Sequence, residues 1–127
     1  MSLPFIYSHV DMRVRDRVKA IAFYDDLLGL LGLHRGETKP EHEWVSYSRR
    51  DGTEQWFAFT QAERVNPGDA RIAFAVSARE VVDQAAELAR RIGARNVEGP
   101  EEAYGPDYYA VFFEDPDGNK LEVCCID

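Results

Sequence analysis

The stretch RIAFAVSA, residues 71–78, repeats the pattern of HVDMRVRD, residues 9–16, and this repeat decides the fold. The apolar residues that match are Val10 with Ile72, Met12 with Phe74 and Val14 with Val76. Because successive side chains of a strand point to opposite faces, this alternation is typical of a strand with one buried face. The chain is therefore predicted to build the same unit twice, each copy beginning with a strand.

A helical pattern follows each of these strands. Apolar residues at spacings of three and four positions run through 20–31 and again through 81–92, which predicts two amphipathic helices. Gly32 and Gly93 stand at matching positions after them, where a helix commonly ends. The segment 77–80 begins with Ser and ends with Glu, which predicts a capping box at the start of the second helix.

Three more strands are predicted after each helix. They lie near 33–38, 43–49 and 54–60 in the first copy and near 94–98, 108–114 and 119–125 in the second. The last hairpins also correspond, because Asp51-Gly52 precedes the final strand of the first copy as Asp117-Gly118 does in the second. Module 1 is expected at about 4–60, a linker at 61–69 and module 2 at about 70–126.

The predicted fold class is α+β: two tandem βαβββ modules that form a curled mixed sheet with the helices outside. Neither half carries enough apolar surface to fold well alone. We therefore expect one domain over residues 1–127.

Composition and charge exclude several classes of partner. A net charge of −8 disfavours nucleic acid and anionic membranes as partners. No apolar run approaches the ~20 residues of a membrane span, and the first residues do not resemble a signal peptide. The two cysteines, Cys124 and Cys125, are adjacent and would point to opposite faces of a strand, so a disulfide is not expected. We expect a cytoplasmic protein.

The face of the sheet away from the helices collects polar and aromatic side chains. Strand parity places His9, Asp11, Arg13, Trp56, Arg71 and Glu122 on this face. Counting from the two turn glycines makes Trp56 the first-half counterpart of Glu122. The face is lined by alanines, so it would form a pocket if the sheet curls.

The order, spacing and repetition of these segments resemble the vicinal oxygen chelate superfamily. This superfamily includes glyoxalase I, bleomycin-resistance proteins, fosfomycin-resistance enzymes and extradiol dioxygenases. FYDDLLGLLGL, 23–33, is similar to the first-helix signature, and DPDGNKLEV, 115–123, is similar to the last hairpin. YGPDYYAVFFEDPDGN, 104–119, is most similar to an uncharacterised glyoxalase-like branch. The resemblance implies paired modules that curl into a cup, and commonly a homodimer.

The resemblance also implies where a metal would bind. Metal-using members take one ligand near the start of the first strand, one at the start of the fifth and a glutamate on the last. His9 and Glu122 stand at the first and last of these positions. An imidazole and a carboxylate suit Zn, Ni, Mn or Fe, and such an ion would act as a Lewis acid on vicinal substrate oxygens.

The fifth-strand position departs from that pattern, because it holds Arg71. A guanidinium has no lone pair to donate, and its charge repels a cation. Two ligands rarely hold a catalytic ion, so the prediction is that no metal is needed. We expect Arg71 to form an ion pair with Glu122 instead, with the binding of an anionic substrate as the alternative.

Other readings of these residues stay open. Glu122 is a partner of Arg71, a metal ligand or a solvent-exposed residue. His9 hydrogen-bonds a neighbour such as Asp11, binds a metal or touches the substrate. A metal would need a third ligand, from His42, Asp11 or a partner subunit.

The aromatic residues leave alternatives as well. Trp56 is a cavity wall or core residue, or else a stacking platform. Tyr104, Tyr108 and Tyr109 line the mouth of the cup or simply pack.

Three functions follow from these observations. The first is a metal-independent protein that binds a small anionic molecule, with or without transforming it. The second is a metal-dependent lyase, isomerase or dioxygenase that uses His9 and Glu122. The third is a protein that sequesters a drug or metabolite without catalysis. The candidate catalytic residues are His9, Arg71 and Glu122; the candidate substrate-binding residues are Asp11, Arg13, Trp56, Arg71, Tyr108 and Tyr109.

Overall fold

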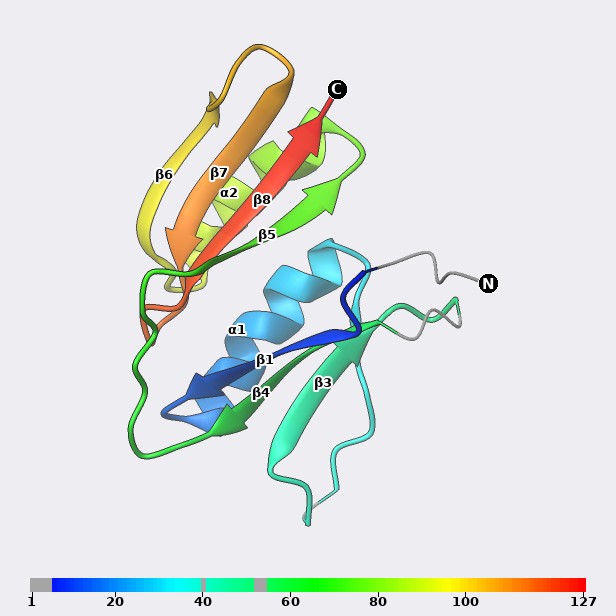
Figure 1. Cartoon of the computed structure of the whole chain (residues 1–127), viewed down its shortest axis with the longest axis vertical. Coiled ribbons are helices and arrows are strands. Elements are labelled where there is room, and N and C mark those ends of the chain that lie inside the picture. Colours follow the sequence, from blue (N-terminus) through cyan, green and yellow to red (C-terminus); the bar gives the residue numbers. More distant parts are fainter. Residues whose placement is uncertain (1–5, 40, 52–54) are drawn as a thin grey trace. The chain divides into compact units, whose positions relative to one another are not determined.

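The computed structural model of the chain describes residues 6–39, 41–51 and 55–127. It divides into two compact units, Met1–Val65 and Asn66–Asp127. Each unit is one βαβββ module with its own four-stranded mixed sheet and one helix (Figure 1). The α+β class and the two repeated modules predicted from the sequence are therefore confirmed.

The described residues of the first unit form one helix and four strands. They are β1 (His9–Val14), α1 (Arg17–Leu30), β2 (His34–Arg35), β3 (Trp44–Ser48) and β4 (Trp56–Gln61). The strand order in the sheet is β1-β4-β3-β2, with β1 parallel to β4 and the other two pairs antiparallel. The helix thus makes the crossover that a parallel pair requires.

The second unit repeats this topology. Its elements are β5 (Arg71–Val76), α2 (Arg79–Arg91), β6 (Arg95–Glu102), β7 (Tyr108–Glu114) and β8 (Lys120–Ile126). The strand order is β5-β8-β7-β6, again with the first strand parallel to the last. The predicted strands agree closely with these bounds, except that β2 is only two residues long and β6 extends to Glu102. Gly52 of the predicted first turn lies outside the described residues.

The two helices begin in different ways. Asp16 is the N-cap of α1, and its carboxylate accepts a hydrogen bond from the backbone N–H of Lys19. The N-cap of α2 is Ala78, whose side chain has no hydrogen-bonding group. The predicted capping box is therefore wrong, because the helix begins one residue later than a Ser77 cap requires.

Both helices end where the sequence predicts. Gly32 and Gly93 follow them with φ angles of 84° and 90°, a left-handed conformation that glycine adopts without the steric cost of a Cβ. Backbone N–H groups just past each helix bond back to its last carbonyls, as Leu33 does to Leu28 and Ala94 does to Ala89.

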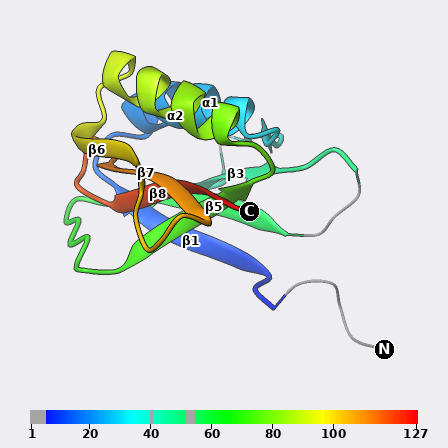
Figure 2. The ribbon, with the colours of Figure 1, turned by 90° about the horizontal axis from the view of Figure 1, so that it is seen from above.

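Each helix covers one face of its own sheet and leaves the other face without a helix (Figures 1 and 2). In the first unit Tyr24 of α1 is fully buried, and its ring lies 5.0 Å from Phe57 and 5.3 Å from Phe59 of β4. In the second unit the helix buries smaller side chains: Val82, Ala85, Ala86 and Ala89. Burying a large apolar side chain contributes about 1.5–3 kcal/mol, so the helix–sheet contacts help to stabilise each unit.

No helix among the described residues is long and apolar enough to cross a membrane.

Candidate functional site

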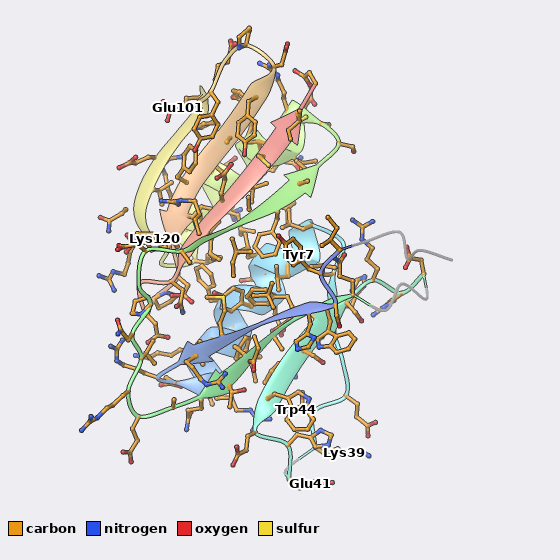
Figure 3. The ribbon with its side chains drawn as sticks, in the orientation of Figure 1. Tyr7, Lys39, Glu41, Trp44, Glu101 and Lys120 are labelled. Atoms are coloured by element: carbon orange, nitrogen blue, oxygen red, sulfur yellow. The ribbon has the colours of Figure 1, made fainter. Side chains whose placement is uncertain are left out.

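The face of the second sheet away from α2 carries charged and small side chains. Cross-strand register places Arg71, Ala73, Ala75, Tyr108, Ala110, Phe112, Glu114, Lys120, Glu122 and Cys124 on it. We call this set the second helix-free face. Lys120, labelled in Figure 3, lies at the start of β8, directly opposite Arg71 of the parallel neighbour β5.

Arg71 is held in place by two contacts. Its Nη1 donates a 2.8 Å hydrogen bond to the carbonyl of Leu121, and its guanidinium carbon lies 5.1 Å from the centroid of the Phe112 ring. Stacking on an aromatic face suits the flat guanidinium and leaves its edge N–H groups free to bond elsewhere. Among the described residues, no carboxylate lies within ion-pairing distance of Arg71.

Glu122 has a different partner from the one predicted. It is buried, with 4% of its surface exposed, and its Oε2 accepts a hydrogen bond from the hydroxyl of Tyr108 on β7. The predicted Arg71–Glu122 ion pair is therefore wrong in this structure. The reason is the strand register. Glu122 lies opposite Ala73, two residues beyond Arg71. At this offset the Glu122 carboxylate bonds the Tyr108 hydroxyl, and the Arg71 guanidinium bonds the Leu121 carbonyl.

The environment of Tyr108 also changes its pKa. Burial, followed by hydrogen bonds to Cys124 and Glu122, raises the pKa of its phenol well above the usual value. The phenol therefore stays protonated and acts as a donor that fixes the orientation of the Glu122 carboxylate.

The residues between these groups are small. Ala73, Ala75 and Ala110 have no side chain beyond Cβ. Ala73 and Ala75 on β5 are exposed, whereas Ala110 on β7 is fully buried. Tyr108 lies on the same face as Ala110, two residues before it on β7.

The corresponding face of the first sheet is aromatic. His9, Asp11, Arg13, Trp44, Ser46, Ser48, Trp56, Ala58 and Thr60 share it, and we call this set the first helix-free face. The His9 ring stacks on Trp56, with centroids 5.0 Å apart and an interplanar angle of 6°. His9 Nδ1 lies 3.0 Å from the Ser8 hydroxyl.

The predicted bond between His9 and Asp11 does not form. Asp11 instead pairs with Arg13 at 3.1 Å and accepts a 3.5 Å bond from the Thr60 hydroxyl. His9 instead contacts the adjacent Ser8 hydroxyl and the Trp56 ring on the neighbouring strand.

The structure also contains a second aromatic pair, which the sequence does not predict. His42 stacks on Trp44, with centroids 4.4 Å apart and an interplanar angle of 13°. Trp44, labelled in Figure 3, is 49% exposed at the start of β3. Parity within the predicted strand 43–49 could have placed Trp44 on this face, but nothing in the sequence placed His42 over it.

Tyr109 does not share a site with Tyr108. Its hydroxyl donates to Asp83 of α2, and Arg79 of α2 lies 4.8 Å from its ring centroid. Tyr109 therefore lies on the helix side of the second sheet and belongs to the packing of α2. Strand parity alone would have separated the two adjacent tyrosines.

Two features of these residues bear on metal binding. Arg71 has no lone pair to offer at the fifth-strand position, and Tyr108 already occupies one oxygen of Glu122. The described residues contain no group of three or more His, Cys, Asp or Glu side chains that could bind an ion together.

A family model of the glyoxalase/bleomycin resistance protein/dioxygenase superfamily matches residues 6–123. The chain belongs to this superfamily. Uncharacterised protein PA2024 of Pseudomonas aeruginosa is 30% identical over 121 residues, which cover 91% of this chain and 84% of PA2024. The superfamily match explains the repeated module, but it does not say what this member binds.

Solved structures agree with this assignment. A glyoxalase/bleomycin resistance protein from Albidiferax ferrireducens T118 aligns with a TM-score of 0.79 at 25% identity, covering 95% of this chain and 98% of that one. The fosfomycin resistance protein FosX from Listeria monocytogenes aligns with a TM-score of 0.76 at 16% identity, covering 98% of this chain and 96% of that one. The second likeness shows the fold alone.

Proposed function

We propose that this protein binds a small anionic molecule on its second helix-free face through Arg71, and that this binding needs no metal. The observation that carries the proposal is an arginine that stacks on Phe112 and bonds a backbone carbonyl, with no carboxylate partner among the described residues. An arginine held in this way is suited to take a carboxylate or phosphate on its remaining N–H groups.

Anion binding at this site must depend on charges close to it, because the net charge of the whole chain repels anions. Its net charge is −8, but exposed charges are screened beyond a Debye length of about 8 Å at physiological ionic strength. Lys120 lies opposite Arg71, but it contacts the Asp69 carboxylate at 3.4 Å and has Glu114 opposite it on β7. The attraction for an anion near the start of β5 is therefore assigned to Arg71, which has no carboxylate partner among the described residues.

The preorganisation of Arg71 supports useful affinity. A free arginine loses side-chain freedom when it binds a ligand, whereas this one is already restrained by Leu121 and Phe112. A charge-assisted hydrogen bond contributes about 1.5–3 kcal/mol, so a two-point contact places small acids in the micromolar to millimolar range.

The test compares ligands in the presence of a chelator. Thermal unfolding and calorimetric titration are measured with pyruvate and with inorganic phosphate, for the wild type, Arg71→Ala and Arg71→Lys. Arg91→Ala on α2 is the matched control, because it removes the same charge from the helix side. We expect at least a tenfold loss of affinity in Arg71→Ala, a smaller loss in Arg71→Lys and none in Arg91→Ala.

Two results would contradict the proposal. One is binding of these anions that survives Arg71→Ala unchanged. The other is binding that appears only after Zn, Ni, Mn or Fe is added and that disappears in Glu122→Gln, which would restore the metal-dependent alternative.

Incubation of each bound acid with the protein, followed by NMR of the small molecule, separates the remaining alternatives. Conversion of the acid would make the protein an enzyme. Binding without conversion would make it a sequestering protein.

A further inference from the structure

The second helix-free face holds two opposite charges that do not neutralise each other. Arg71 bonds a backbone carbonyl and an aromatic ring, and Glu122 bonds the Tyr108 hydroxyl. A buried carboxylate is costly unless its oxygens have hydrogen-bond partners. Among the described residues Glu122 has the Tyr108 hydroxyl as its donor, and no arginine forms an ion pair with it.

The spacing of these two groups fits a small molecule. They lie on neighbouring parallel strands, with Glu122 two residues further along than Arg71, so their Cα atoms are about 8 Å apart from strand spacing and rise. Ala73 lies beside Glu122 in the register and fills little of the space between them. A molecule of a few heavy atoms can therefore reach both groups at once.

The Glu122 carboxylate has one oxygen left for a ligand. Its Oε2 takes the Tyr108 hydroxyl, and no hydrogen bond to its Oε1 is seen within the described part of the chain. No buried side-chain oxygen or nitrogen of the described residues lacks a partner. The Oε1 atom therefore reaches the surface, where it is able to accept a hydrogen bond from a ligand.

We propose that the ligand of this face is bifunctional: a small acid that carries a hydroxyl or ammonium group close to its acidic group. This inference rests on the proposed binding of an anion at Arg71. The acid takes the free edge of the guanidinium, and the hydroxyl or ammonium donates to Glu122 Oε1. Tyr108 is a positioning residue, since it holds the carboxylate in the orientation that accepts this bond.

The arrangement also selects against other small molecules. A simple carboxylic acid satisfies Arg71 but leaves Glu122 without a donor. A diacid brings a second negative charge towards Glu122 and is repelled. A cation without an acid group gains nothing from Arg71.

The test uses three acids with one carbon skeleton: propionate, lactate and alanine, which carry hydrogen, hydroxyl and ammonium at the same carbon. Binding is followed as shifts of amide resonances in the labelled protein, which detects millimolar affinities. In the wild type we expect lactate or alanine to bind about tenfold more tightly than propionate. In Glu122→Gln this preference should fall to about twofold while propionate binding stays unchanged.

Two further variants separate positioning from folding. Tyr108→Phe keeps the carboxylate and should weaken the preference for lactate or alanine without affecting propionate. Glu87→Gln on the exposed side of α2 is the matched control and should change nothing. Circular dichroism shows whether each variant is folded.

The outcomes are distinguishable. Equal binding of all three acids, unchanged in Glu122→Gln but lost in Arg71→Ala, would overturn this inference and leave the anion site standing. No binding of any of the three acids at 50 mM, a concentration far above about a 1 mM dissociation constant, would overturn both.

Discussion

The two modules share one topology but present opposite chemistry on their helix-free faces. The first face is built from two tryptophan–histidine stacks, and its carboxylate, Asp11, is paired with Arg13. The second has a buried carboxylate, Glu122, held by a tyrosine, and an arginine that pairs with no carboxylate of the described residues. The same backbone can therefore make a neutralised aromatic surface and a surface that keeps its charges available.

Register shows where these differences arose. Val10 and Ile72 are equivalent positions of the two modules. Val10 lies opposite Phe57 in the first sheet, and Ile72 lies opposite Leu121 in the second. Phe57 therefore corresponds to Leu121, and the next residue, Ala58, corresponds to Glu122. The prediction that Trp56 corresponds to Glu122 is therefore wrong. The prediction failed because the connections before the last strands differ in length. The connection spans residues 49–55 in the first module but only 115–119 in the second, which is two residues shorter. Counting the same number of residues from each turn glycine therefore misplaces the correspondence by two positions.

The largest effect that we expect distinguishes the two cores. Tyr24 and Ala85 are equivalent positions of the two helices, because each lies eight residues before the glycine that follows its helix. The variant Tyr24→Ala therefore places the residue of the second helix in the first. The lost ring contacts with Phe57 and Phe59 should lower the free energy of unfolding by about 3–5 kcal/mol. Urea unfolding measures this change.

Tyr24→Phe is the control for that prediction, because it keeps the ring and should retain most of the stability. A loss below about 1 kcal/mol in Tyr24→Ala would show that the first core does not depend on this ring.

The next effect concerns the turn that starts β8. Asp115 is fully buried, and its carboxylate accepts bonds from the backbone N–H of Asp117 and Asn119 and from the Asn119 side chain. Asp115→Ala leaves these donors without their acceptor and should cost about 3 kcal/mol in urea unfolding.

Asp69→Ala is its matched control in the same module. The Asp69 carboxylate is fully exposed, and its one contact within the described part of the chain is with Lys120 at 3.4 Å, so the change should stay within about 0.5 kcal/mol. Equal losses in the two variants would show that the buried turn does not stabilise the second module.

The tyrosine that holds Glu122 gives a smaller, pH-dependent effect. Burial and the bonds to Cys124 and Glu122 raise the pKa of Tyr108 above the value of about 10 for an unfolded tyrosine. The folded state therefore retains the proton longer, so this contribution to stability is complete below about pH 10 and is lost as the pH rises further.

Unfolding measured from pH 8 to pH 12 should show a steeper decline for the wild type than for Tyr108→Phe. Tyr47 remains in both proteins, and its pKa is also raised, chiefly by burial and then by its bond to Asp25. Identical slopes in the two proteins would contradict the account of Tyr108.

The smallest effect distinguishes the two arginines. Arg13 and Asp11 are both about half exposed, so Arg13→Ala should change stability by less than about 1 kcal/mol. It should also leave the binding of pyruvate unchanged, whereas Arg71→Ala should abolish it. Equal losses of binding would show that the two faces are not chemically distinct.

Much of the fold could be predicted from the sequence because it depends on periodicity. The alternation in 9–16 and 71–78 fixed which side chains face the helix, and His9, Arg71 and Glu122 lie on the predicted face. The partners of these residues could not be predicted. Parity gives the face of a side chain, but a pairing depends on the register between strands and on which donor lies nearest.

Arg71 illustrates this limit. The sequence predicts an ion pair between Arg71 and Glu122, whereas in the structure a backbone carbonyl and the Phe112 ring contact Arg71. Neither contact has a signature in the sequence, because every strand offers carbonyls and aromatic residues are common in strands.

The most direct test of the account is the NMR signal of the Arg71 side-chain Nε–H during a titration with pyruvate in the presence of a chelator. The account predicts that this signal shifts and saturates as the acid binds, while the Nε–H signal of Arg91 on α2 stays unchanged. An Arg71 signal that stays fixed while pyruvate binds elsewhere on the protein would contradict it.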